Sequence, residues 1–222
     1  MWPTDDEPRP RDGASATIIS SLAGRPLHAL PAPRPLPDIS FSDVLAARRS
    51  AVSGPLSDQE LGDLLFHVMR WRRGGTGRFG QPWEGRASPS AGGLHVISLL
   101  CIPVQGQTPI GIYETRHHGL RLVEAADHLS GENAANVELL ASARSGTTLQ
   151  FMADAGRLEA CYENSATLLW RDSGALAATI CLVAACLGLT AVVLGRTGAS
   201  LPAPEGLDGM LAVGAVHLGA PT

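Results

Sequence analysis

An uncharged run from Ser173 to Gly195 constrains the fold of this chain more than any other feature of its sequence. Its length would suit a helix that crosses a membrane. The run changes character at Gly188, because residues 175–187 are rich in alanine and leucine and residues 189–194 are rich in β-branched side chains. A glycine between a helical and an extended pattern typically ends the helix. We therefore favour a helix followed by a buried strand over a membrane span. A helix that is apolar on all sides must be covered by its own domain or by a second subunit.

The composition indicates one folded domain, alone or with a short arm. The chain has 222 residues, of which 45% are hydrophobic, enough for a substantial core. A net charge of −4 argues against a nucleic-acid partner, which requires a concentrated positive field. Every basic residue is an arginine, so mechanisms that require a lysine are excluded. The acidic, polar N-terminus does not resemble a secretory signal, and we predict a cytoplasmic protein without membrane contact.

The order of helical and extended patterns predicts an α+β fold. Residues 1–38 are proline-rich and are predicted to form an arm, a candidate for wrapping a partner subunit, and residues 39–222 form the domain. Ser57 and Glu60 match a capping box at the start of a helix that Gly74 and Gly75 end, and a glycine-rich loop follows to Gly85. We expect further helices over 44–49, 131–143, 153–163 and 175–187, strands over 96–102, 147–152, 189–194 and 210–216, and a hairpin over 109–123.

Three segments carry residues suited to holding a ligand. Arg48 and Arg49, followed by Ser50, can hold a phosphate through paired hydrogen bonds, although adjacent arginines are more often a solvated face. The loop from Pro89 to Gly93 lets the backbone approach a flat ligand closely, and equally forms a tight structural turn. Residues 194–198 follow the end of a predicted buried strand, where ligands gather in many folds, and are otherwise an ordinary turn.

The remaining polar side chains favour structural roles. His117 and His118 lie in the predicted hairpin turn without a metal-binding motif, so we predict no metal. His95 follows the glycine loop and is either a hydrogen-bonded structural histidine, the commoner case, or a catalytic base. The four cysteines are interpreted as buried, reduced thiols. Four arginines near residues 70–78 are interpreted as charges at a helix C-terminus rather than a ligand site: Arg70, Arg72, Arg73 and Arg78.

Several of these segments occur together in a characteristic order. They are Ala47–Ser50, Pro55–Ser57, Arg86, Pro89–His95, Gly111–Tyr113, Leu120–Leu122, Trp170–Leu176, Leu187–Leu189 and Leu194–Gly195. In this order they resemble the nitroreductase-like flavoprotein superfamily and are most similar to its SagB-type, or thiazole/oxazole (azoline), dehydrogenases. The resemblance covers about residues 40–217, and the Pro-Ser-Ala-Gly-Gly-Leu-His run at its distance from Arg-Arg-Ser is its most specific part.

The resemblance implies an α+β homodimer with a central mixed or antiparallel sheet flanked by helices. It further implies FMN at the subunit interface, with the apolar helix buried there. By the same resemblance, Arg48 and Ser50 would contact the FMN phosphate with Arg49 beside them, and the backbone of Gly195 and Arg196 would lie near flavin N5. The isoalloxazine and ribityl would be lined by Pro89, Ser90, Ala91 and Gly92.

Three positions depart from the family pattern. Val52 stands where a further cation is usual, and the tail from Met210 to Thr222 has no arginine or lysine. The lysine–tyrosine pair associated with azoline dehydrogenation is absent, although Tyr162 falls near the tyrosine position and is the candidate catalytic residue. Arg86 or the arginines of residues 70–78 are candidates to replace the missing phosphate cations.

The function that follows from the resemblance is FMN-dependent oxidoreduction. We expect dehydrogenation of a modified peptide or related small product, with other biosynthetic enzymes as possible partners. Two alternatives stay open, an NAD(P)H-dependent nitro or quinone reductase and a non-catalytic scaffold that no longer binds FMN tightly. Because a flavin performs the redox chemistry itself, a site with few acid or base residues is compatible with either enzyme.

Overall fold

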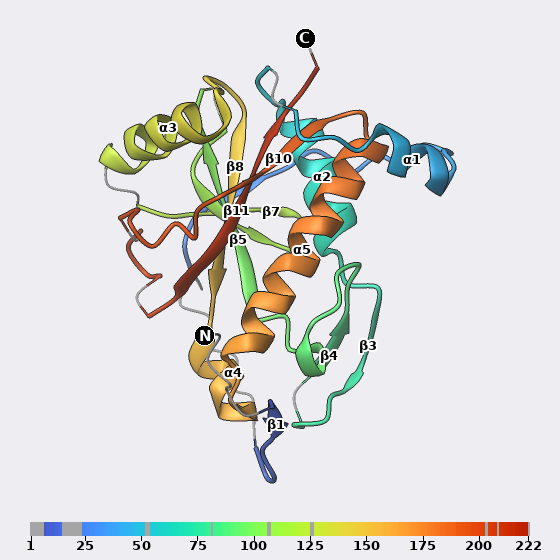
Figure 1. The fold of residues 1–222 in the computed structure, drawn as a ribbon, viewed down its shortest axis with the longest axis vertical. Helices are drawn as coiled ribbons and strands as arrows, with labels where there is room; N and C mark the ends of the chain where they lie inside the picture. Colours follow the sequence, from blue (N-terminus) through green and yellow to red (C-terminus); the bar gives the residue numbers. More distant parts are fainter. Residues whose placement is uncertain are drawn as a thin grey trace.

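A computed structural model describes residues 7–14, 24–51, 54–80, 82–105, 108–124, 127–202, 204–207 and 209–221. Val52, one of the three departures noted above, lies outside these residues. The described part of the chain forms an α+β fold around one antiparallel sheet (Figure 1). The fold class predicted from the sequence is therefore confirmed.

The central sheet has seven strands in the order β10-β11-β8-β5-β6-β7-β2. Each strand is antiparallel to its neighbours. In chain order the strands are β2 (Leu27–Ala29), β5 (Ile97–Pro103), β6 (Gly111–Glu114), β7 (Gly119–Leu122), β8 (Thr147–Ala153), β10 (Thr190–Leu194) and β11 (Leu211–Gly219). Two small sheets lie outside it and pair β1 (Arg9–Pro10) with β9 (Tyr162–Glu163) and β3 (Arg73–Thr76) with β4 (Pro82–Gly85).

Helices cover both faces of the central sheet (Figure 1). On β5, Leu99 and Cys101 pack into the large core shared with α2 and α5, whereas Leu100 and Ile102 pack into a smaller core that includes Leu129 of α3. Alternate residues of a strand face opposite sides, so these two cores lie on opposite faces of the sheet. The helices are α1 (Phe41–Ala47), α2 (Asp58–Met69), α3 (Asp127–Ala141), α4 (Ala155–Cys161) and α5 (Ala166–Cys186).

The predicted elements agree with the structure in most places. The capping box at the start of α2 is present, with the Ser57 backbone N–H donating to Glu60 Oε2 at 2.8 Å and the Glu60 N–H donating to Ser57 Oγ at 3.3 Å. The helix predicted from the uncharged run is longer than expected, because α5 already begins at Ala166. The charged residues Arg171 and Asp172 do not end it, because Arg171 is exposed and the half-buried Asp172 accepts hydrogen bonds from Ser90 and Ala91.

Two predictions are wrong here, because α2 ends at Met69 instead of continuing to Gly74, and the segment that follows to Gly85 is not simply a loop. Residues 73–76 and 82–85 form the β3–β4 hairpin, in which Gly74 pairs with Glu84 and Gly75 pairs with Trp83. Glycine is a weak strand former, so a glycine-rich strand leaves little signal in the sequence. Strand β3 is therefore fixed by its hydrogen bonds to β4 and not by the intrinsic preference of its glycines.

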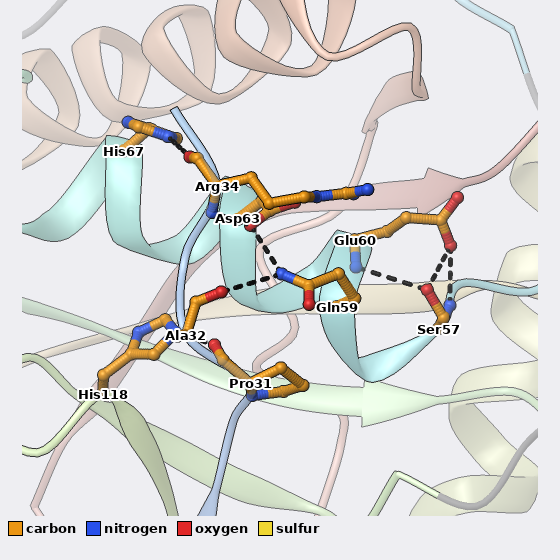
Figure 2. A network of polar contacts seen from close by, with 9 residues as sticks. All are labelled: Pro31, Ala32, Arg34, Ser57, Gln59, Glu60, Asp63, His67 and His118. Atoms are coloured by element: carbon orange, nitrogen blue, oxygen red, sulfur yellow. Dashed lines mark hydrogen bonds and ion pairs between the residues drawn. The ribbon is translucent and has the colours of Figure 1, made fainter. Parts of the chain in front are cut away.

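The segment predicted to be an arm is attached in part to the body of the chain. Strand β2 pairs with β7 at the edge of the central sheet. Just beyond it, the buried carboxylate of Asp63 on α2 accepts hydrogen bonds from the backbone N–H and the Nε of Arg34 at 2.8 and 2.7 Å (Figure 2). Gln59 donates to the Ala32 carbonyl at 3.1 Å, and the His118 ring bonds the Pro31 carbonyl at 2.9 Å. Residues 27–34 are thus fixed to the sheet and to α2, and a contact with a partner subunit stays a prediction.

Helix α5 is long and apolar enough to span a membrane, and in this fold one side of it packs on the central sheet. Among the described helices it alone meets these two criteria. Its inner side lies on β10 and β11, and 39% of its most apolar window is buried. Its outer side leaves Trp170 49% exposed, together with Gly174 and Ala178 one and two turns further on. The sheet therefore covers one side of this apolar helix and leaves the other uncovered.

Candidate functional site

The loop that follows β4 is fixed to α5 by one carboxylate. Asp172 Oδ2 accepts a hydrogen bond from Ser90 Oγ at 2.7 Å, and the backbone N–H of Ala91 lies 3.1 and 3.0 Å from the two carboxylate oxygens. Ser90 Oγ in turn accepts from the His95 backbone N–H at 3.0 Å. Burial raises the pKa of Asp172, and the bonds from Ser90 and Ala91 oppose that rise. The carboxylate thus orders the loop before any ligand binds.

The two glycines of this loop are required by both conformation and space. Gly92 and Gly93 have φ angles of +58° and +65°, which side-chain-bearing residues rarely adopt. A Cβ on Gly92 would lie 2.7 Å from the Tyr162 hydroxyl, and one on Gly93 would lie 2.0 Å from Trp83 Nε1. The close approach predicted for a flat ligand is made, at these two positions, by the chain's own aromatic side chains.

Tyr162, the candidate catalytic residue, lies beside this loop. It follows α4 and its ring packs edge-on against Phe79, with ring centroids 5.3 Å apart. Burial raises its pKa, so the phenol stays protonated at neutral pH. A protonated phenol next to the loop donates hydrogen bonds rather than removing protons.

His95 ends the loop in a strained backbone conformation, with φ at +46°. Burial, together with the neighbouring Arg86 guanidinium, lowers its pKa to about 4, so the ring is neutral at neutral pH. Arg86 donates from Nη2 to Glu84 Oε2 at 3.0 Å, while its buried Nε has no hydrogen-bond partner among the residues that the structure describes. The geometry is compatible with His95 as a structural histidine and also with His95 as a catalytic base, because a neutral imidazole can accept a proton.

The second group of predicted residues lies on the outer edge of β10. Arg48 ends α1, and Ser50 forms a parallel bridge with Ala191 of β10. Arg48, Arg49 and Ser50 are all exposed. Gly195 follows the other end of the same strand, also exposed. The phosphate-binding candidates and the Gly195 backbone therefore border one edge strand.

Arg196 points away from that edge. Its Nη2 donates to Asn133 Oδ1 of α3 at 2.6 Å, and burial lowers its pKa. Its Nε and Nη1 are buried and have no hydrogen-bond partner within the described part of the chain. The side chain of Arg196 is thus directed to α3, and only its backbone is available to contact flavin N5 as the resemblance implies.

Within one chain, the structure brings the predicted site residues together in two groups rather than one. Arg86, Pro89–Gly92 and Tyr162 surround the start of α5, whereas Arg48–Ser50 lie near Cys181 further along it. About 13 Å of helix separates Asp172 from Cys181. Asp172 is the residue that the sequence analysis did not single out as a site residue. In the sequence, Asp172 is distinguished only as the carboxylate that directly precedes the uncharged run starting at Ser173.

The comparisons with known proteins concern the fold. No family model matches the chain, and no curated protein matches it. Among solved structures, a protein assigned as a nitroreductase from Ralstonia eutropha JMP134 is 23% identical, with a TM-score of 0.62 over 97% of this chain and 99% of that chain.

Two further structures have the same fold at lower identity. A protein assigned as a nitroreductase from Anabaena variabilis is 20% identical, with a TM-score of 0.56 over 79% of this chain and 38% of that one. A chain of the Escherichia coli microcin synthetase McbBCD complex with truncated pro-MccB17 bound is 15% identical, with a TM-score of 0.55 over 95% of this chain and 89% of that one. The chain thus has a nitroreductase-like fold.

Proposed function

We propose that the chain is an FMN-dependent oxidoreductase that transfers a hydride between its substrate and the flavin. The observation that carries the proposal is the position of Arg48–Ser50 on the outer edge of β10 in a nitroreductase-like fold. Two of the proteins with this fold are assigned as nitroreductases. The sequence motifs and the fold support the same class of activity from independent observations.

The residues at the β10 edge fit the phosphate end of FMN. Among the described residues, neither Arg48 nor Arg49 has a carboxylate within ion-pair distance, so both guanidiniums are available to an anion. Ser50 adds a hydroxyl beside them. Because β10 is the last strand of the sheet, its outer edge beyond the Ser50 bridge is open to a ligand. Charge-assisted hydrogen bonds of this kind contribute about 1.5–3 kcal/mol each.

Each group of residues then has a distinct task. Bound FMN supplies the hydride acceptor or donor, and the protein supplies position and electrostatics. Arg48 and Ser50 hold the phosphate, Pro89–Gly92 line the ring and ribityl, and the backbone of Gly195 and Arg196 faces the ring. Tyr162 donates a hydrogen bond near the reacting centre.

We propose further that the cofactor lies between two copies of the chain. The outer side of α5 exposes Trp170, and α1 exposes Phe41 and Leu45, which are 66% and 51% accessible. An apolar surface of this kind is typical of an interface. A homodimer would cover it and would place the 89–92 loop of one copy opposite the β10 edge of the other.

For the reaction itself we propose dehydrogenation of a modified peptide or a related small product. The E. coli neighbour belongs to a microcin synthetase complex, which supports a peptide-derived substrate and partner enzymes in the same assembly. With no lysine in the chain, the neutral His95 imidazole and the Asp172 carboxylate are groups near the loop that can accept a proton. We place this activity in the cytoplasm.

The absorbance spectrum of the purified protein tests the flavin. We expect flavin absorbance as isolated or after FMN is added, and a colourless protein that ignores added FMN contradicts the proposal. Rapid bleaching by NAD(P)H favours the alternative reductase. Bleaching by an azoline-containing peptide, with NAD(P)H slow, favours the dehydrogenase.

Subunit mixing tests the shared site. Arg48→Gln and Ser90→Ala are each expected to weaken FMN binding. If every site combines Arg48 of one copy with Ser90 of the other, a mixed dimer contains one intact site, and mixing the two variants restores part of the FMN binding. No recovery after confirmed subunit exchange would place both residues in sites of a single chain.

A non-catalytic scaffold is the second candidate. Residues 211–221, which include β11 and the tail, hold no arginine or lysine. Arg48 and Arg49 therefore have few further cations beside them to bind the FMN phosphate. Millimolar FMN affinity in a folded dimer would favour the scaffold over the enzyme.

A further inference from the structure

A groove of about 260 Å³ lies between the β3–β4 hairpin and the 86–95 loop. Arg72 and Arg73 line it from the hairpin, and Arg86 and His95 line it from the loop. Its residues Arg86, Pro89, Ser90 and His95 also line a smaller cavity that reaches Asp172 of α5. The groove therefore adjoins the loop that we propose to line the flavin.

The groove carries an excess of positive charge. Two carboxylates lie beside it: Glu84 is already paired with Arg86 at 3.0 Å, and Asp172 accepts hydrogen bonds from Ser90 and Ala91. Over the described ranges of the chain, no carboxylate lies within ion-pair distance of Arg72 or Arg73. Guanidiniums gathered around one groove repel one another, and an anion between them removes that repulsion. The chain as a whole is acidic, so this concentration is local and not a consequence of composition.

One wall of the groove is aromatic and fixed in place. Trp83 lies directly against Gly93, so closely that a Cβ on Gly93 would be 2.2 Å from Trp83 Cδ1. The hairpin pairs Trp83 with Gly75, which leaves no side chain opposite it. An indole face next to guanidinium groups suits a planar ring that carries an oxyanion, because the ring stacks while the arginines bind the charged oxygens.

We propose that this groove binds a carboxylate or phosphate group attached to a planar ring of the substrate or of the reductant. Its role beside a flavin rests on the proposed function, whereas the binding itself does not. Arg72 and Arg73 determine the specificity for charge, and Trp83 that for a flat ring. The sequence analysis interprets Arg72 and Arg73 as charges at the end of a helix. In the fold, the hairpin brings them next to the 86–95 loop, where we propose that they bind a ligand.

Calorimetric titration of the full chain with matched probes tests the groove. Benzoate and phenyl phosphate carry an oxyanion on a ring, and benzamide has nearly the shape of benzoate without its charge. We expect at least one of the anions to bind about tenfold or more tighter than benzamide, a difference of about 1.4 kcal/mol. Whichever anion binds more tightly identifies a carboxylate or a phosphate as the natural group.

The double variant Arg72→Gln/Arg73→Gln is expected to lose most of this preference. Both side chains are exposed, so folding should be retained, and single variants serve if it is not. Arg144→Gln, an exposed arginine that pairs with Glu138, is the control and keeps the preference. Equal affinity for benzamide and both anions, or a preference that survives the double variant, overturns the proposal. A preference in a protein that binds no flavin would refute the proposed function and leave the groove intact.

Discussion

The 86–95 loop and the outer edge of β10 both carry residues that the sequence marks as ligand contacts, yet they are built differently. In the loop, Ser90 and Ala91 donate hydrogen bonds to Asp172, and the His95 backbone N–H donates to Ser90. At the β10 edge, Arg48 and Arg49 are exposed and project from a short helix of which only Val44 is buried. The loop is ordered by the fold, whereas the edge presents exposed charges that are free to contact a ligand or a second copy.

This difference separates two kinds of mutational effect. Changes in the loop should alter the free energy of unfolding even without a ligand, because the bonds they break already exist. Changes at the edge should leave that free energy nearly unchanged and alter ligand binding instead. The following predictions test the distinction, from the largest expected effect on stability to the smallest.

Gly93→Ala should give the largest loss. The new Cβ would clash with the Trp83 indole, and the alanine would have to adopt a φ of +65°. Strain and overpacking together cost about 3 kcal/mol. Urea unfolding measures the change, with Gly174→Ala on the outer side of α5 as control, since nothing lies within 4 Å of a Cβ there. Equal stability of Gly93→Ala and the wild type would show that the loop is not held as described.

His95→Asn should remove a pH dependence of similar size. Because the His95 pKa is lowered from 6.5 to about 4, the unfolded chain takes up a proton between these values that the folded chain does not. Stability therefore rises with pH across this window, and the contribution, up to about 3 kcal/mol, is complete above about pH 6.5. The variant should flatten this slope, and exposed His117→Asn should not. An unchanged slope in His95→Asn would contradict a buried, neutral imidazole.

Asp172→Asn should destabilise the protein by about 2 kcal/mol, because the bonds from Ser90 and Ala91 lose their charge assistance and the new NH2 group competes for a place beside the Ala91 N–H. The relief of burying a charge, which raises the Asp172 pKa, offsets part of the loss. Thermal or urea unfolding gives the value, with neighbouring Arg171→Gln as the control. A loss no greater than that of the control would mean that the loop orders itself without the carboxylate.

Arg48→Gln should change the stability of the flavin-free chain by less than about 0.5 kcal/mol. Its effect should appear in FMN affinity, weakened about tenfold to a hundredfold as one charge-assisted contact is lost. Flavin fluorescence titration measures this, with Arg144→Gln as control. If Arg48→Gln instead unfolds the protein, the edge is a structural element and the comparison with the loop fails.

The sequence predicts the ordinary elements of this fold well, because each depends on local signals. The capping box of Ser57 and Glu60 marks the start of α2, and Gly188 marks the end of α5, where its φ is +71°. The hairpin turn before Gly119 also lies where the alternation of residues 110–122 places it. The β3–β4 hairpin is missed, since glycines in strands carry no such signal.

The candidate site, too, has features that local sequence signals predict and features that only the tertiary structure shows. The residue types and spacing of Arg48–Ser50 and Pro89–Gly93 indicate ligand contacts, and these segments are visible without a structure. Tertiary structure decides that Asp172 holds the loop, that the Arg196 side chain turns to Asn133, and that Arg72 and Arg73 face Trp83 and His95 across a groove. Hydrogen-bond partners far apart in the chain depend on which elements pack together, and no local pattern encodes that choice. The sequence determined which chemical groups this protein has and which short segments they occupy, and the packing of the hairpin and helices on the sheet decided which of them meet.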